Sequence, residues 1–140
     1  MKYNEFSNTG WKVSEIGLGC WQIGWCWGDV SNKDARNLLH KALDKGINFF
    51  DTSDTYGDGR SEKFLSEIKK IRSNQIYVTT KLGRRIRGTN YKKGYKHEPM
   101  EEFINRSLKN LDVEKIDLVQ LHCPPIDAVS YTHLRAHETI

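Results

Sequence analysis

The sequence predicts an α/β fold and, more narrowly, the amino-terminal half of a (β/α)8 barrel. Short apolar runs alternate with amphipathic helical segments, a pattern typical of right-handed βα crossovers in a parallel sheet. Ionisable residues follow three successive apolar runs, as expected where several strands end around one site. A complete barrel needs about 250 residues. A chain of 140 residues with four βα units therefore corresponds to half of one.

Each element has its own signal. Residues 11–19 form the first expected strand, with Val13, Ile16 and Leu18 as its apolar residues and with Gly17 and Gly19 near its end. The first helix begins after Ser31, a capping residue with Asp34 three positions on, and ends at Gly46. Its apolar stripe consists of Ala35, Leu38, Leu39, Ala42 and Leu43. The later elements are a strand at 47–50, a helix at 61–71, a strand at 75–82, a helix at 99–111 opened by Pro99, and a strand at 116–121.

Two architectures fit this order of elements. A doubly wound sheet gathers a site only at its switch point, whereas a barrel brings the carboxyl ends of all its strands around one axis. Chemistry at several successive strand ends favours the barrel.

The composition is that of an ordinary globular protein, with a net charge of +4, 29% charged residues and 11% aromatic residues. No run approaches the ~18 apolar residues of a membrane span, and the amino terminus lacks a signal-peptide core. We therefore expect a cytoplasmic protein without a membrane partner. The three cysteines have no zinc-like spacing and are expected to be free thiols.

The last residues do not continue the pattern of strands and helices. Residues 129–140 resemble a translated sequencing adapter, so we expect a partial barrel at 1–128 followed by a non-native tail. Within this tail, His133 and His137 are spaced as a helical metal pair would be. Their order with Glu138 does not match a zinc protease motif, and we expect no metal site.

Four residues at the strand ends make a coherent chemical set: Asp51, Tyr56, Lys81 and His122. A phenol titrates near 10 and is a weak acid at neutral pH. A nearby ammonium stabilises a phenolate, and a carboxylate holds the ammonium in place. An imidazole adds a donor that can orient a carbonyl oxygen. Such a set protonates a carbonyl that receives a hydride, and the hydride must come from a nicotinamide or flavin cofactor.

Five segments of the chain resemble the aldo-keto reductase family. They are residues 17–21 (GLGCW), 50–57 (FDTSDTYG), 61–62 (SE), 79–81 (TTK) and 117–122 (DLVQLH), and the resemblance extends over residues 2–128. It implies a (β/α)8 barrel that reduces small-molecule aldehydes or ketones with NADPH.

The resemblance also implies roles for individual residues. Tyr56 becomes the general acid, Lys81 and Asp51 tune it, and His122 positions the substrate carbonyl. The positions near the nicotinamide ribose are Gly19, Cys20, Trp21 and Asp51, where Cys20 departs from the threonine common in the family. Residues 1–13 resemble the hairpin that closes the barrel floor. The same fold also serves as a nicotinamide-binding regulatory subunit, which is the alternative function, and the 140-residue chain alone is expected to be inactive.

Each residue has a structural alternative. Asp51 could cap a turn, Lys81 could be a solvated strand end, and His122 could be a structural histidine. Only their common order and placement favour catalysis. Gly17 and Gly19 suggest a dinucleotide loop, but the third glycine of that motif is missing, and we expect them to let the loop pass close to the barrel mouth. The tryptophans Trp21, Trp25 and Trp27 could line a substrate pocket or pack in the core.

One loop carries the strongest basic cluster. It comprises Arg84, Arg85, Arg87, Lys92, Lys93 and Lys96, interleaved with Tyr91 and Tyr95. Such a mixture can bind single-stranded nucleic acid. A solvated loop after the third strand, bordering the substrate, is the preferred interpretation, and we expect no nucleic-acid partner.

Overall fold

The computed structural model describes residues 1–24, 28–72 and 76–126. Its main sheet has four parallel strands in the order β3-β4-β5-β6, which is also their order along the chain. The strands are β3 (Leu18–Gly19), β4 (Phe49–Asp51), β5 (Tyr77–Leu82) and β6 (Leu118–Leu121). The order has no switch point in the described part, which agrees with a barrel and not with a doubly wound sheet.

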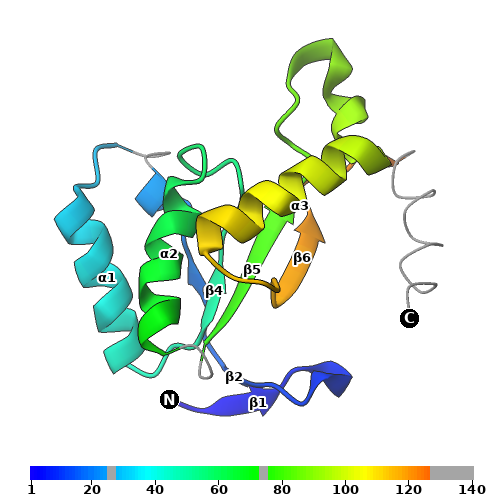
Figure 1. The fold of residues 1–140 in the computed structure, drawn as a ribbon. Coiled ribbons are helices and arrows are strands. Elements are labelled where there is room, and N and C mark those ends of the chain that lie inside the picture. The colour runs from blue at the N-terminus through cyan, green and yellow to red at the C-terminus, as the bar shows by residue number, and fades with distance from the viewer. Residues whose placement is uncertain (25–27, 73–75, 127–140) are drawn as a thin grey trace.

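Three helices connect the strands and lie on one face of the sheet (Figure 1). They are α1 (Asn32–Asp44), α2 (Arg60–Ile71) and α3 (His97–Leu111). Two short 3-10 helices, η2 (Gln22–Gly24) and η3 (Gly88–Tyr95), lie in the loops after β3 and β5. Helices on a single face of a parallel sheet are the outer ring of a (β/α)8 barrel, so the predicted half barrel is confirmed.

The helix boundaries differ little from those expected from the sequence. Ser31 caps α1 by accepting a hydrogen bond from the Asp34 backbone N–H at 3.1 Å, as predicted. Helix α3 begins at His97, two residues before Pro99, because the first-turn N–H groups have no helical partner and proline is tolerated there. Leu38, which the sequence places in the apolar stripe of this helix, departs from that expectation: it is 42% exposed, whereas its neighbour Leu39 is fully buried.

The expected single strand at residues 11–19 is also wrong. Its first part is β2 (Lys12–Ser14), which pairs antiparallel with β1 (Tyr3–Glu5), and its last part is β3 in the other sheet. The chain bends between them, where Ser14 donates its hydroxyl to the carbonyl of Ile16 at 2.7 Å. Apolar residues stand on both sides of the bend, Val13 before it and Ile16 and Leu18 after it, which is why the sequence suggests one strand.

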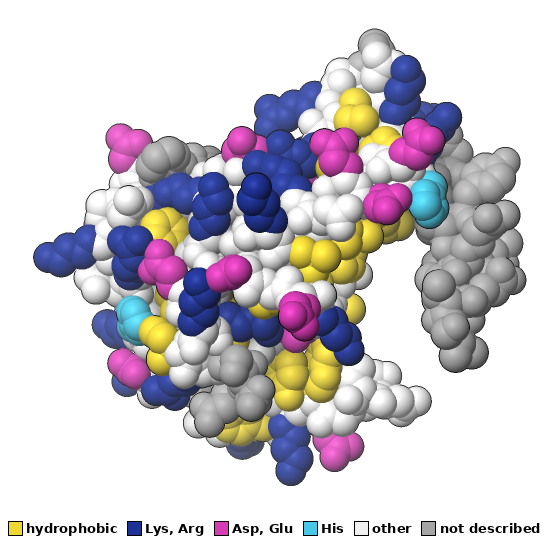
Figure 2. Space-filling view, in the orientation of Figure 1, with side chains coloured by type: hydrophobic (Ala, Val, Ile, Leu, Met, Phe, Trp, Pro, Cys, Tyr) yellow, Lys and Arg dark blue, Asp and Glu magenta, His cyan; other side chains and the backbone are white. Residues whose placement is uncertain are grey.

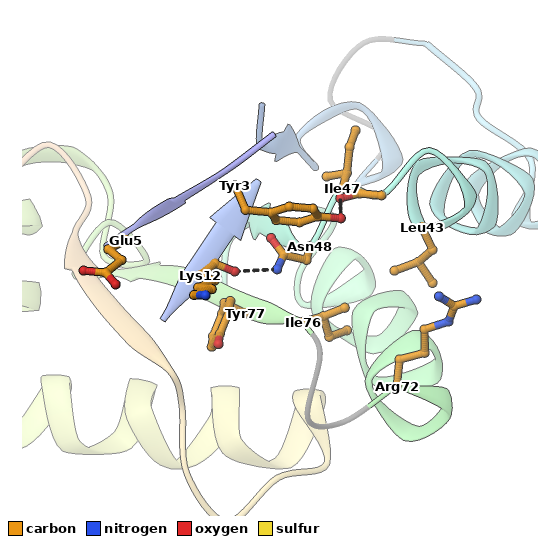
Figure 3. Close-up of a pocket in the computed structure, with 10 residues that line it drawn as sticks. Tyr3, Glu5, Lys12, Leu43, Ile47, Asn48, Arg72, Ile76 and Tyr77 are labelled. Carbon is orange, nitrogen blue, oxygen red and sulfur yellow. Dashed lines mark hydrogen bonds between the residues drawn. The ribbon is translucent and has the colours of Figure 1, made fainter. Parts of the chain in front are cut away.

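The β1–β2 hairpin lies at the amino ends of the parallel strands, as the family resemblance implies (Figures 1 and 3). Asn48, directly before β4, donates to the carbonyl of Lys12 at 2.8 Å and accepts from the N–H of Ser14 at 2.7 Å. Trp11 stacks on Tyr77, the first residue of β5, with ring centroids 4.7 Å apart. A cavity of about 600 Å³ remains between the hairpin and the sheet (Figure 3).

The core is formed by the inner faces of α1 and α2 against the sheet, and α3 adds Leu111 to it. Phe50 on β4 is fully buried at its centre. Among the described residues no helix is long and apolar enough to cross a membrane. The expectations for Trp25, Trp27 and the 129–140 tail with its two histidines fall outside the described residues.

Candidate active site

The four predicted residues meet at the carboxyl ends of three neighbouring strands. Asp51 is the last residue of β4, Lys81 is the penultimate residue of β5, and His122 directly follows β6. Tyr56 lies in the turn between β4 and α2. Because the parallel strands pair in register, these ends form one edge.

Lys81 and Asp51 form an ion pair beside the Tyr56 ring. The Lys81 ammonium also donates to the Thr52 carbonyl at 3.3 Å, which fixes its position. Its nitrogen lies 5.6 Å from the centroid of the Tyr56 ring. The Lys81 side chain is 20% exposed and that of Asp51 is 37% exposed, so the pair is partly shielded from water. The positive charge is therefore held next to the phenol.

His122 faces the same tyrosine. The two rings meet edge to face, with centroids 5.8 Å apart and an interplanar angle of 90°. Burial is the main reason that the pKa of His122 falls from its ordinary value of 6.5 to about 4, and the charges of Arg84 and Lys81 lower it further. At neutral pH the imidazole is therefore uncharged and carries one N–H.

Ser53 contacts one ring nitrogen of His122. Its hydroxyl oxygen lies 3.0 Å from His122 Nδ1 and 3.0 Å from the carbonyl of Lys81. That carbonyl also accepts the Asp54 N–H at 3.4 Å. The Ser53 hydroxyl has one proton, which the Lys81 carbonyl accepts, so the role of Nδ1 in its contact with Ser53 is set by the His122 tautomer. In the tautomer with its proton on Nε2, that N–H can serve a ligand. Sequence reasoning missed Ser53, because only its place between Asp51 and Tyr56 connects it with the site.

Asp54 is a second residue that sequence reasoning missed. It is fully buried, and its Oδ2 atom has no hydrogen-bond partner among the described residues. Burial raises the pKa of its carboxyl group to about 6, although the charges of Arg85 and Arg106 oppose the rise. Arg85 forms a long ion pair with Asp54, with its Nε 3.9 Å from Oδ2.

A buried polar network holds the turn that carries Tyr56. Thr52 donates to Ser61 at 2.8 Å, at the start of α2. Glu62, which is fully buried, accepts from Thr80 at 2.7 Å and from Asn110 at 2.8 Å. These bonds link the residue after β4 to α2, and α2 to β5 and α3, so the turn is anchored at both ends.

A cavity of about 790 Å³ opens at this edge. Its lining includes Tyr56 and His122, Trp21 from the loop after β3, and six residues of the loop after β5, which are Arg84, Ile86, Arg87, Gly88, Tyr91 and Tyr95. Lys81 and Asp51 lie beside Tyr56 and do not line the cavity. Tyr56 and His122, which are expected to contact a carbonyl group, therefore face the open cavity. Lys81 and Asp51, which are expected to tune the Tyr56 phenol, lie outside the cavity lining.

The residues expected near the nicotinamide ribose differ in their exposure to solvent. Trp21 is 40% exposed, with its ring 6.5 Å from that of Tyr56. Cys20 is 1% exposed, and burial raises the pKa of its thiol to about 12, so its side chain is not on the cavity surface. Of the two glycines expected to allow a close approach, Gly17 does so, since a Cβ there would lie 3.2 Å from the Phe49 side chain, whereas nothing lies within 4 Å of a Cβ placed on Gly19. A tighter approach occurs at Gly24, where a Cβ would lie 2.6 Å from the Tyr56 carbonyl carbon.

Within the described residues, no group of three or more His, Cys, Asp or Glu side chains could hold a metal ion. The chain matches the family model of the Aldo/keto reductase family over residues 15–138.

Individual relatives and solved structures agree with the family match. Aldo-keto reductase YhdN of Bacillus subtilis is 34% identical over 127 residues, which are 89% of this chain and 38% of that protein. A probable voltage-gated potassium channel subunit beta of Oryza sativa is 33% identical over 89% of this chain and 38% of that protein. The solved structure of aldo-keto reductase AKR11C1 from Bacillus halodurans, in its holo form, has a TM-score of 0.72 and 30% identity, and covers 99% of this chain and 47% of that one. The chain thus spans less than half the length of these proteins.

Proposed function

This chain belongs to the aldo/keto reductase family, and we propose that it is the amino-terminal half of a nicotinamide-dependent reductase of aldehydes or ketones. One observation carries the proposal. The Lys81–Asp51 ion pair lies beside a tyrosine whose ring meets that of His122 at the wall of a cavity. The matched length of the relatives supports the view that the barrel continues beyond this chain.

In the proposed reaction Tyr56 is the general acid. It gives its phenolic proton to the carbonyl oxygen as the carbonyl carbon is reduced. The Lys81 ammonium stabilises the phenolate that remains, and Asp51 keeps that ammonium in place beside the ring. Lys81 and Asp51 act through Tyr56 and do not touch the substrate.

His122 orients the substrate in this proposal. Because its imidazole is neutral at neutral pH, it can donate one hydrogen bond without competing for the proton that Tyr56 transfers. A donor on His122 and an acid on Tyr56 would together hold one carbonyl oxygen between two rings that already meet edge to face.

The reaction needs a hydride, which no side chain supplies, and a bound nicotinamide would provide it. The described residues fit such a group. Trp21 offers an exposed ring next to Tyr56, and the partly exposed carboxylate of Asp51 can accept a ribose hydroxyl. The buried thiol of Cys20 does not fit a direct contact. The family resemblance favours NADPH over NADH, and we place the reaction in the cytoplasm.

The 140-residue chain alone is expected to lack activity. Strands β3 and β6 each have one edge unpaired among the described residues, and such edges promote association between chains. We predict weak NADPH binding and aggregation or pairing of the isolated chain. Light scattering after gel filtration tests this, and a monodisperse monomer with reductase activity would refute it.

A non-catalytic nicotinamide-binding regulatory subunit is the second candidate, favoured by the similarity to a potassium channel subunit. The full-length protein separates the two functions. Consumption of NADPH that depends on an added aldehyde supports the reductase. Tight NADPH binding with negligible turnover across a panel of aldehydes and ketones selects the regulatory subunit.

A further inference from the structure

We propose that the carbonyl substrate of this site carries an anionic group, a carboxylate or phosphate, and that Arg84 and Arg87 bind it. This inference rests on the proposed reductase function and names the substrate class of the same cavity. It gives a role to two members of the basic loop, which the reaction itself does not use.

The cavity is positive and aromatic on the side of this loop. Both arginines line it together with Tyr91 and Tyr95, and no Asp or Glu is among its described lining residues. Lys and Arg side chains also gather over the η3 end of the molecule, at the top of the view in Figure 2. A substrate whose carbonyl lies between Tyr56 and His122 would extend its remaining part toward this wall.

The arginines of this loop differ in their contacts. Arg85 turns away from the cavity lining, donating to Asp58 at 2.7 Å and to the Asp54 carbonyl at 3.0 Å. In the described part of the chain neither Arg84 nor Arg87 forms a salt bridge, and Arg84 has only a 3.9 Å contact with the Cys123 sulfur. Their guanidinium groups therefore keep donors for a ligand, in the planar arrangement that suits carboxylate and phosphate oxygens.

The loop is anchored close to His122, which presets the position of these arginines. Tyr95 is 7% exposed and donates its hydroxyl to the carbonyl of His122 at 2.6 Å. Its ring packs directly on Gly83, whose φ of +104° and lack of a Cβ allow the contact. The loop therefore turns back onto the strand end, and the charge of Arg84 is close enough to lower the pKa of His122.

A matched pair of substrates tests the inference in the full-length reductase. We expect 4-carboxybenzaldehyde to be reduced with a kcat/KM at least about tenfold higher than its methyl ester, which keeps the ring and aldehyde but lacks the charge. The R84Q/R87Q double variant should lose this preference, mainly through a higher KM for the acid. A double variant of Lys33 and Lys41 to Gln, on the exposed face of α1, makes the same change in net charge as a control.

Two further readouts separate the possible outcomes. If the arginines bind phosphates of the cofactor instead, R84Q/R87Q raises the KM for NADPH with both aldehydes, and the inference is overturned. Equal rates with the acid and the ester overturn it as well, but leave the proposed reductase intact. Benzoate binding, followed by tryptophan fluorescence, does not require turnover. It should weaken about tenfold or more in R84Q/R87Q, and unchanged benzoate binding refutes the inference even if the protein proves to be no reductase.

Discussion

Two buried groups at the site should give the stability of the protein opposite dependences on pH. The pKa of His122 is about 4 in the folded state, below its ordinary 6.5, so the unfolded state binds the proton more tightly. As the pH falls from 6.5 toward 4, protonation of His122 therefore favours the unfolded state, and the protein loses stability. The pKa of Asp54 is about 6, above its ordinary 3.8, so the folded state holds that proton more tightly. The cost of its buried charge disappears as the pH falls from 6 toward 3.8.

The two contributions are similar in size. Each gap in pKa corresponds to about 3 kcal/mol, at about 1.4 kcal/mol for a tenfold change in proton affinity. His122 borders an open cavity, so solvent screening reduces its share to about 2 kcal/mol. Between pH 4 and 6 the contributions therefore nearly cancel in the wild type.

Single substitutions should reveal how each group makes the free energy of unfolding depend on pH. We expect Asp54→Asn to be more stable than the wild type at pH 7, by up to about 3 kcal/mol, and to lose that advantage as the pH falls. His122→Gln should show the reverse trend, gaining stability relative to the wild type toward pH 4. Urea unfolding followed by tryptophan fluorescence across this range measures both, and the double variant should show neither slope. Curves for Asp54→Asn that run parallel to those of the wild type at every pH would show that this carboxyl group is not shifted by burial.

Three further predictions concern individual side chains. Lys81→Met should slow the reduction step about 10²- to 10⁴-fold, because Tyr56 loses the charge beside its ring, and a single-turnover measurement with unchanged rate would exclude that role. Ser53→Ala should lower kcat about tenfold, with a change in the ¹⁵N shifts of His122 that reports a different tautomer. An altered rate without a change in those shifts would assign Ser53 a purely structural role. Cys20 should resist thiol reagents in the folded protein and react only after unfolding, because its thiol is buried.

The fold could be predicted from the sequence because its signals are periodic. The stripes of α1 and α2 recur at helical spacing, and the parallel strands follow as apolar runs. The four site residues could be predicted for a related reason. Parallel strands end at one edge, so their order along the chain also gives their proximity. The bend between β2 and β3 could not, because it depends on the hydroxyl of Ser14 and on Asn48, which lies 34 residues away.

The contacts that could not be predicted from the sequence are made by residues in turns and loops. Ser53 and Asp54 lie in a turn, where side-chain direction follows no period, and their partners come from β5, α3 and the residue after β6. The basic loop is a similar case. Nothing in its sequence distinguishes Arg85, which pairs with Asp58, from Arg84, which lines the cavity.

The most direct test of the proposed mechanism compares two phenols on the same cavity. Tyr56 stands beside the Lys81–Asp51 pair, whereas Tyr91 lines the cavity from the loop and is 41% exposed. In single-turnover experiments with bound NADPH, Tyr56→Phe should oxidise the nicotinamide at least about a hundredfold more slowly than the wild type while it still binds the cofactor, and Tyr91→Phe should retain the wild-type rate. A Tyr56→Phe variant that reduces the aldehyde as fast as the wild type would contradict the assignment of Tyr56 as the acid.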